Sequence, residues 1–265
     1  MLGEKLMKRK AIILVNDDGK LPGLAKDSDN IVSFLKSLAG GSWYDSEIEI
    51  IKNPTLYNLK LKLAIQRLTP VDFCLVFFSG HGGNDGRKTH IQINNQKETI
   101  EESALFGFAD KQINFFDCCR SFSEDLVQKS QRSTTFSMED SQTNYLSIAE
   151  SRRIYSELIT KAVNQRAVFY SCELNEVSYD SSEGAVYLSS FLKNASEYSK
   201  HTTDKSKLAI LVHTQAEKYV KSLNPRSDGN QNPTYVYPKI GGNVQDYLPI
   251  SINPYSTAHY RPMFG

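Results

Sequence analysis

Two apolar runs in this 265-residue chain end abruptly on polar and reactive side chains. The run "LVFFSGHGG" (75–83) ends on a serine and His81, and "INFFDCCRSF" (113–122) ends on an aspartate and two cysteines that include Cys119. A histidine and a cysteine on neighbouring strand ends are what thiol catalysis needs, because the imidazole takes the thiol proton and the thiolate attacks a carbonyl. The pattern therefore predicts His81 as general base and acid and Cys119 as nucleophile.

Strand alternation separates the residues of each motif into two groups. Side chains two positions apart share a face, so Ser79 goes with His81, and Asp117 goes with Cys119. Cys118 faces the other way, into packing, and we expect it to be structural; a nucleophilic Cys118 would break the alternation. The glycines after the histidine let substrate backbone approach, and the amides of Gly82 and Cys119 are predicted to form an oxyanion hole.

The elements around these motifs predict an α/β fold. Continuous apolar runs indicate parallel strands buried on both faces, and their alternation with helical patterns predicts an open, mostly parallel sheet with helices on both faces. Strands are expected at 10–16, 47–52, 71–79, 112–118, 167–172 and 234–237. Helices are expected from a cap at Asp27 or Ser28 to Gly40, and at 55–68, 100–111, 147–163, 184–195 and 204–223.

The organisation of the chain indicates one domain over residues 1–265. A polar, serine-rich stretch at about 121–146 lacks a steady period, so we expect a long internal loop there. The chain is turn-rich from about 223 onward. This tail carries no signal for an oligomeric state.

Composition excludes several classes of function. The formal charge is +1 and no dense basic stretch occurs, so no nucleic-acid partner is expected. No segment has the length of a membrane span, and the start lacks the pattern of a signal peptide, so we expect no membrane partner and a cytoplasmic protein. The four cysteines lack zinc spacing, which predicts neither metal nor cofactor. The stretch "NDDGKLPG" is no phosphate-binding glycine fingerprint.

At these residues the chain resembles the caspase-like cysteine peptidases, which include caspases, paracaspases and metacaspases. "SGHGG" (79–83) matches the histidine motif of that family, and "DCCRS" (117–121) is close to the cysteine motif of metacaspases and paracaspases. "LPGLAKDSDNIVSFL" is similar to the opening turn and first helix, and the resemblance spans roughly residues 9–240. It implies a three-layer sandwich and a peptidase that acts on protein or peptide substrates. The caspase signature with glutamine before the cysteine is absent.

The resemblance also implies a pocket for a basic side chain ahead of the scissile bond. Asp27 and Asp117 fall at the positions of its two carboxylates, with Ser79 and Leu24 beside them. Two carboxylates in a desolvated pocket select arginine or lysine. Two alternatives stay open: Asp27 is the cap of the first helix, or Leu24 closes the pocket and the preference is not basic. No paired aspartates stand where calcium-dependent metacaspases carry them, so calcium activation lacks visible ligands.

Regulation is suggested by the internal loop, because in this family the segment after the nucleophile often controls activation by being cut, and this loop carries basic residues that the predicted pocket would accept. We predict self-cleavage near Lys129 or Arg132; the alternative is a flexible linker. An activating partner would act on the domain directly. By analogy alone, a single-domain build suggests a prokaryotic protein of regulated proteolysis or defence. The rival of another class is a non-catalytic scaffold or binding module that keeps the fold.

Overall fold

The computed structural model describes residues 7–19, 22–121, 130–131, 146–198, 204–224, 230–238, 240, 243 and 246–255. Lys129 and Arg132, the predicted self-cleavage sites, lie outside these residues. So does most of the loop predicted at about 121–146, within which the structure describes β8 (Ser130–Gln131). The single-domain organisation stays a prediction.

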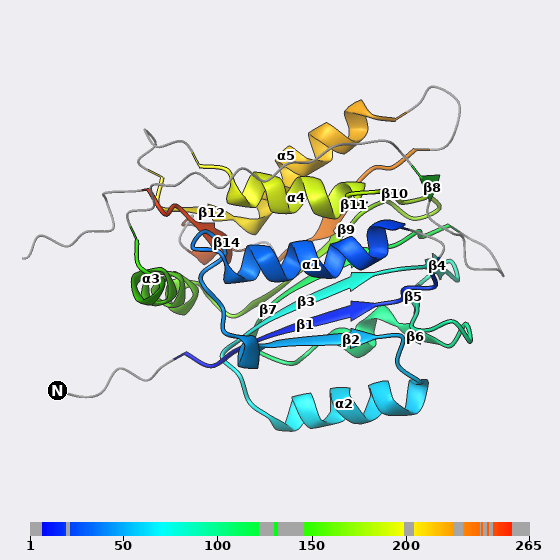
Figure 1. The fold of residues 1–265 in the computed structure, drawn as a ribbon, viewed down its shortest axis with the longest axis horizontal. Coiled ribbons are helices and arrows are strands. Elements are labelled where there is room, and N and C mark those ends of the chain that lie inside the picture. Colours follow the sequence, from blue (N-terminus) through cyan, green and yellow to red (C-terminus); the bar gives the residue numbers. More distant parts are fainter. Residues whose placement is uncertain are drawn as a thin grey trace, which may run out of the picture.

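A six-stranded sheet forms the centre of the molecule, in the order β13-β9-β7-β3-β1-β2 (Figure 1). Neighbouring strands are parallel, except that β13 at one edge pairs with β9 in antiparallel orientation. The strands are β1 (Arg9–Val15), β2 (Ile48–Lys52), β3 (Phe73–Ser79), β7 (Lys111–Asp117), β9 (Gln165–Tyr170) and β13 (Thr234–Val236). The predicted mostly parallel sheet is confirmed.

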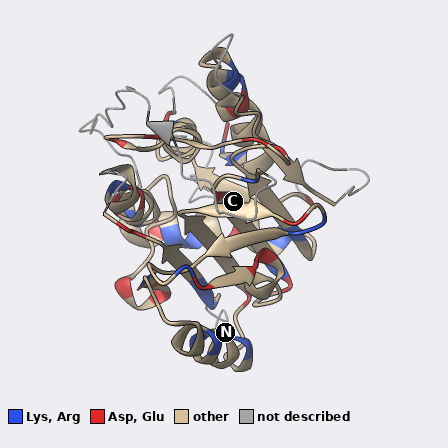
Figure 2. Cartoon of the chain, turned by 90° about the vertical axis from the view of Figure 1, so that its right-hand side faces the viewer, with Lys and Arg blue, Asp and Glu red and all other residues tan. Residues whose placement is uncertain are grey.

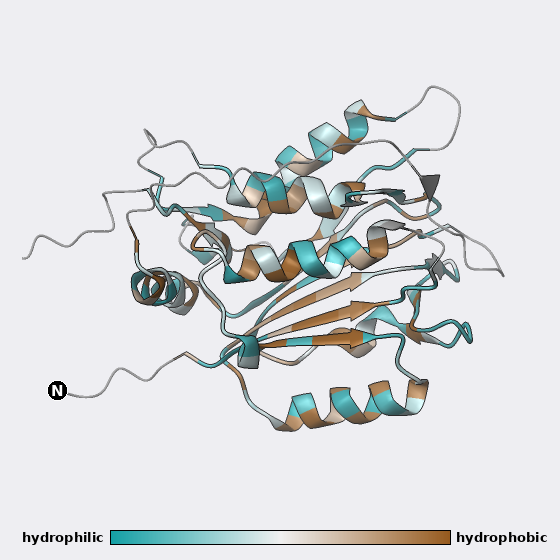
Figure 3. Cartoon of the chain, in the orientation of Figure 1, coloured by the Kyte–Doolittle hydropathy of each residue, from teal (hydrophilic) through white to brown (hydrophobic). Residues whose placement is uncertain are grey.

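The strands are hydrophobic at consecutive positions because each side of the sheet faces its own core. On β1, Ala11, Ile13 and Val15 pack into one core, whereas Ile12 and Leu14 pack into the other. β3 and β7 divide their side chains in the same way, and Figure 3 shows β1 and β3 in the brown of apolar residues. Burial on both faces is the physical reason for an unbroken apolar run.

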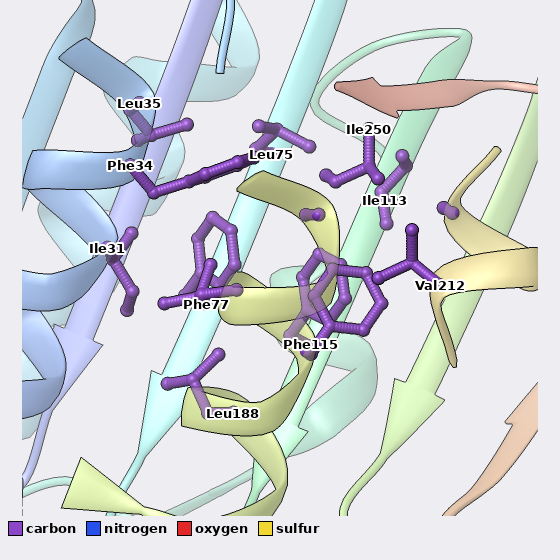
Figure 4. Close-up of a cluster of buried hydrophobic side chains, with 14 of the residues drawn as sticks. Ile31, Phe34, Leu35, Leu75, Phe77, Ile113, Phe115, Leu188, Val212 and Ile250 are labelled. Carbon is purple, nitrogen blue, oxygen red and sulfur yellow. The ribbon is translucent and has the colours of Figure 1, made fainter. Parts of the chain in front are cut away.

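Aromatic stacking ties the central strands together in the first core. The rings of Phe77 on β3 and Phe115 on β7, both labelled in Figure 4, stack at 4.7 Å between centroids. Phe115 stacks in turn on Phe169 of β9 at 5.3 Å. Burying each ring contributes about 2–3 kcal/mol. The stack holds β3, β7 and β9 in register up to the edge where the candidate residues lie.

Helices cover both faces and make the molecule a three-layer sandwich (Figure 1). Four helices supply residues to the first core: α1 (Pro22–Lys36), α3 (Ile148–Lys161), α4 (Val186–Ser196) and α5 (Ala209–Ser222). On the other face, α2 (Leu56–Leu68) buries Leu59 and Leu63 in the second core. Thr55 caps α2 by accepting a hydrogen bond from Asn58 N.

The segment predicted as a helix at 100–111 is instead a strand and a short turn. β6 (Thr99–Glu101) completes a small antiparallel sheet with β4 (Gly82–Asn84) and β5 (Thr89–Gln92), followed by the 3₁₀ turn η2 (Glu102–Leu105). The prediction was wrong because Ile100 and Leu105 are buried in the second core by packing under the sheet rather than by a helical stripe.

The first helix also begins earlier than predicted, at Pro22, a residue type suited to the first helical position. Asp27 and Ser28 therefore lie inside α1, and the interpretation of Asp27 as a helix cap is wrong. The expected helix at 204–223 begins as β12 (Ser206–Leu208) before α5, because β12 pairs with β14 (Pro249–Ile252), a strand that the pattern did not indicate. The short strands β10 (Tyr179–Ser181) and β11 (Gly184–Ala185) were missed as well.

Candidate active site

The segments that follow β1, β3, β7 and β9 leave the same edge of the sheet, because these strands are neighbours and parallel. Val15, Ser79 and Asp117 stand level across β1, β3 and β7. Backbone hydrogen bonds extend this ladder one step further, from Asn16 N to Ser79 O at 3.0 Å and from Gly80 N to Asp117 O at 3.2 Å. Figure 2 looks onto this edge of the molecule. Ligands of open α/β sheets bind at this edge.

The histidine motif joins the central sheet to the small sheet. His81 lies between the end of β3 and Gly82, the first residue of β4, and its carbonyl accepts a hydrogen bond from Gln92 N at 2.9 Å. Its ring is only 3% exposed, and Nε2 lies 3.1 Å from Oδ2 of Asp18 in the segment after β1. Among the residues that the structure describes, His81 Nδ1 has no hydrogen-bond partner.

The cysteine motif follows β7 and lies against the histidine motif. A Cβ added to Gly82 would approach Sγ of Cys118 to 2.7 Å and the carbonyl oxygen of Cys119 to 2.9 Å, so the two motifs pack backbone to backbone there. Cys118 belongs to the second hydrophobic core, as the alternation predicts. Cys119 has no exposed surface, and its sulfur accepts a hydrogen bond from the backbone N–H of Ser178 at 3.3 Å.

The two predicted pocket carboxylates are both buried close to the strand ends. Asp27 on α1 accepts hydrogen bonds from the hydroxyl of Ser79 and, at 2.8 Å, from the backbone N–H of Ala185. Asp117 accepts from the hydroxyl of Ser178 at 2.6 Å and from Leu188 N at 3.1 Å. Because these four donors are neutral, none of them cancels the charge of the carboxylate that it contacts.

Two further residues, Leu24 on α1 and Asp180 on β10, are fully buried, and the sequence did not indicate a role for Asp180. Leu24, predicted to flank the pocket, has no exposed surface and packs in the first core. Asp180 on β10 is fully buried, and its carboxylate accepts a hydrogen bond from Gly23 N at 3.1 Å, which fastens the start of α1 to β10.

A short segment after β9, residues 173–178, covers the cysteine. Arg120 N donates to Glu176 O at 3.0 Å, and Asn175 N donates to Arg120 O at 2.8 Å, so this segment is held against the residue that follows Cys119. The carboxylate of Glu176 in turn accepts from Asn232 N at 2.7 Å. Ser178 closes the segment over Cys119. No local sequence pattern indicates this cover, because its contacts join residues that are more than fifty positions apart.

The guanidinium of Arg120 anchors the cysteine motif rather than facing outward. Its Nε donates to the hydroxyl of Thr89 at 3.0 Å, its Nη1 donates to the carbonyl of Cys172 at 3.1 Å, and its plane lies 3.8 Å from the ring centre of Tyr170. Burial and the neighbouring carboxylate of Glu102 raise the pKa of Tyr170, which keeps its hydroxyl neutral beneath the guanidinium. Arg120 thus connects β5, β7 and β9 next to Cys119.

Within the described ranges, no group of three or more His, Cys, Asp or Glu side chains is arranged to hold a metal ion. In that same part of the chain, no helix has the length and apolar character needed to cross a membrane.

A mostly parallel sheet between two helical layers, with a histidine and a cysteine after adjacent strands, is the arrangement of the caspase fold. The family model described as "Caspase domain" matches residues 8–244, so the chain belongs to the caspase-domain family of cysteine peptidases. None of the curated proteins matches the chain.

Three solved structures show the same fold at low sequence identity. Caspase-1 from Spodoptera frugiperda is 13% identical with a TM-score of 0.54, over 87% of this chain and 86% of that one. The protein GSU0716 from Geobacter sulfurreducens is 12% identical with a TM-score of 0.51, over 94% and 98% of the two chains. The Drosophila initiator caspase Dronc is 13% identical with a TM-score of 0.51, over 92% and 84%. The predicted caspase-like fold is confirmed.

Proposed function

We propose that this member of the caspase-domain family is a cysteine endopeptidase that cleaves after arginine or lysine, with Cys119 as nucleophile and His81 as general base and acid. The observation that carries the proposal is the common edge of the sheet: His81 and Cys119 follow adjacent strands, and the buried carboxylates of Asp27 and Asp117 lie at the same edge. Its "DCCRS" motif favours a metacaspase-like or paracaspase-like member. Its four free cysteines fit the cytoplasm.

The reaction follows from the chemistry of these groups. The imidazole of His81 takes the proton of the Cys119 thiol, and the thiolate adds to the carbonyl carbon of the scissile bond. The amides of Gly82 and Cys119 stabilise the oxyanion of the tetrahedral intermediate. The imidazolium then gives its proton to the leaving amine, which leaves a thioester at Cys119. Water, deprotonated by His81, hydrolyses that thioester and restores the thiol.

The preference for a basic residue rests on Asp27 and Asp117. A guanidinium or ammonium that enters between them would pair with carboxylates whose contacts to Ser79, Ala185 and Ser178 are neutral. Charge-assisted bonds of this kind are strong where water is excluded. An aspartate in the substrate would meet like charge and be rejected.

We infer from the closed site that the protein is made as a zymogen. Cys119 is fully buried and Ser178 donates to its sulfur, so residues 173–178 must move before a peptide reaches the nucleophile. Self-cleavage near Lys129 or Arg132, or binding of an activating partner, would supply this movement. Mass spectrometry of incubated wild type and Cys119→Ala protein tests the first route. Fragments that end at either residue only in wild type support it; an intact chain with full peptide activity contradicts it.

A panel of fluorogenic peptides ending in Arg, Lys, Asp or Leu tests the function itself. We expect hydrolysis of the Arg and Lys peptides, complete loss in Cys119→Ala, and retained activity in Cys118→Ala, a matched change of the neighbouring thiol that packs in the core. Cleavage after Asp or Leu alone would reject the basic preference but keep the peptidase. Activity that survives Cys119→Ala would reject the nucleophile.

The burial of Cys119 favours a second candidate, a non-catalytic scaffold that keeps the caspase fold. Thiol reactivity separates the two functions, because a peptidase holds a reactive thiolate and a scaffold does not. Burial raises the pKa of the Cys74 and Cys172 thiols, so these two serve as unreactive internal references. At neutral pH, Cys119 of a peptidase is alkylated by iodoacetamide faster than either reference; in a scaffold all three react equally slowly.

A further inference from the structure

We propose that Asp18 is the positioning residue of His81: its carboxylate holds the ring so that Nδ1 is the nitrogen that takes the proton of Cys119. This inference rests on the proposed peptidase function and deepens it, by adding an acidic side chain to the histidine and cysteine. Asp18 lies in the segment that follows β1, and β1 is the strand next to β3 in the central sheet.

The geometry assigns the hydrogen on the histidine ring. Oδ2 of Asp18 lies 3.1 Å from Nε2 of His81, and the two side chains are 10% and 3% exposed. An ionised carboxylate only accepts hydrogen bonds, so Nε2 carries the hydrogen of this contact. A neutral imidazole has one N–H, so the lone pair is on Nδ1. That atom is buried and without a hydrogen-bond partner among the described residues, which leaves it available for a thiol proton.

The same contact stabilises the charged state that catalysis passes through. When Nδ1 takes the thiol proton, the imidazolium faces a carboxylate at a position with little water, where the attraction of opposite charges is stronger than in bulk solvent. Asp18 therefore favours the pair of thiolate and imidazolium over the neutral thiol and imidazole. The carboxylate of Asp18 stays ionised throughout the reaction and needs no contact with substrate.

The neighbouring aspartate supplies a control for a merely structural role. Asp17 closes the turn by accepting a hydrogen bond from Gly19 N at 3.1 Å, and its carbonyl accepts from the side chain of Asn53 at 2.6 Å. The turn is therefore held by Asp17, whereas Asp18 points to the histidine. Asp17→Asn changes the same charge one position away and should leave the chemistry of Cys119 unaltered.

The test measures the rate of Cys119 alkylation by iodoacetamide from pH 5 to pH 9, followed by peptide mapping. It compares wild type, Asp18→Asn, Asp17→Asn and His81→Ala. We expect the pH of half-maximal rate to rise by about one unit or more in Asp18→Asn, toward the value of His81→Ala, and to stay unchanged in Asp17→Asn. Asp18→Glu, which keeps the carboxylate, should recover most of the shift. In peptide cleavage, kcat should fall about 10²-fold in Asp18→Asn with KM nearly constant.

A wild-type pH profile in Asp18→Asn, or identical profiles in wild type and His81→Ala, overturns the inference. If thermal unfolding measurements show that Asp18→Asn does not fold, Asp18→Ala provides the same comparison. Wild type that cleaves no peptide but shows the Asp18-dependent shift would reject the peptidase function and keep the role of Asp18. Full peptidase activity in both wild type and Asp18→Asn would reject the role of Asp18 and keep the peptidase function.

Discussion

The backbone N–H of Ser178 donates a hydrogen bond to the sulfur of Cys119 over 3.3 Å, while the hydroxyl of the same residue donates to Asp117 over 2.6 Å. Ser178 thus contacts both the proposed nucleophile, Cys119, and one carboxylate of the proposed pocket. A substrate would have to displace Ser178 from both at once. Access to the thiol and access to the pocket are therefore expected to open in a single movement of residues 173–178.

Glu176 is the residue whose removal should release this cover. Its carboxylate accepts hydrogen bonds from Asn232 N at 2.7 Å and from Glu173 N at 3.2 Å. Bonds to a charged group contribute about 1.5–3 kcal/mol each, so Glu176→Ala should raise the open fraction and the alkylation rate of Cys119 about tenfold or more. Timed labelling with iodoacetamide measures this.

Glu173→Ala is the matched control, because it removes the same charge from an exposed side chain of the same segment. Its labelling rate should equal that of wild type. Equal rates in Glu176→Ala and wild type would mean that the cover is held elsewhere.

The proposed preference for basic substrates is expected to depend on Asp27. Asp27→Asn keeps the size of the side chain and one oxygen that can accept from Ala185 N, while its amide NH2 can donate to the hydroxyl of Ser79, but it loses the charge. Truncating or neutralising one partner of a buried charge pair costs about 2–5 kcal/mol, so kcat/KM for an Arg peptide should fall by about 10²-fold. Steady-state kinetics on Arg and Leu peptides measures the change.

Asp29→Asn, a substitution on the exposed side of the same helix, should leave both kinetic constants unchanged. A parallel loss on Arg and Leu peptides in Asp27→Asn would indicate a folding role for Asp27 instead of a role in specificity.

How far the sequence predicts this site depends on the range of the contacts involved. Residues within one strand end, such as Ser79 with His81, follow from period-two alternation and apolar runs, and the burial of Cys118 was predicted on that basis. Polar residues directly after an apolar run are the site candidates that the sequence offers, and the same criterion could have found Asp18. The stretch "NDD" follows the first apolar run directly, as the histidine and cysteine motifs follow the other two runs.

The rest of the site comes from pairings that no local pattern encodes. Ser178 reaches Cys119 across 59 positions, and Gly23 reaches Asp180 across 157. The spacing of apolar residues also led to a wrong helix prediction at 100–111, because Ile100 is buried by packing beneath the sheet and not on one face of a helix. Such contacts are set by tertiary structure, so a single sequence indicates the chemistry of an edge but not which segment covers it.

Arg120 is expected to stabilise the fold through the contacts of its guanidinium next to Cys119. Lysine cannot reproduce the two bonds to Thr89 and Cys172 together with the planar contact over Tyr170. Arg120→Lys should therefore lower the free energy of unfolding by about 2–4 kcal/mol. Urea denaturation measures this value.

The control is Arg153→Lys, which changes a half-exposed arginine whose partner is Glu157 one helical turn away. Surface pairs of this kind contribute about 0.3–0.5 kcal/mol to stability, so the urea concentration at the unfolding midpoint of Arg153→Lys should be close to that of wild type. Equal effects of the two substitutions would show that the contacts of Arg120 add little stability.

His213 makes the stability of the fold depend on pH. It is fully buried on α5, where its Nδ1 lies 2.8 Å from the hydroxyl of Tyr187, and burial lowers its pKa from 6.5 to about 4. The unfolded chain takes up a proton near pH 6.5, whereas the folded protein resists protonation until about pH 4. The contribution of neutral His213 is therefore full above pH 6.5 and is lost as the pH falls toward 4.

The loss from this residue over that interval is about 3 kcal/mol, at 1.36 kcal/mol per pH unit. His213→Gln cannot titrate, so its free energy of unfolding should start lower at pH 7 but fall less steeply between pH 6.5 and pH 4 than that of wild type. Urea titrations at several pH values give both slopes. The carboxylate of Glu217, 3.9 Å from Nε2, opposes the shift, so Glu217→Gln should lower the pKa of His213 further and extend the loss of stability to lower pH. Identical slopes in wild type and His213→Gln would place the acid sensitivity of the protein at other groups.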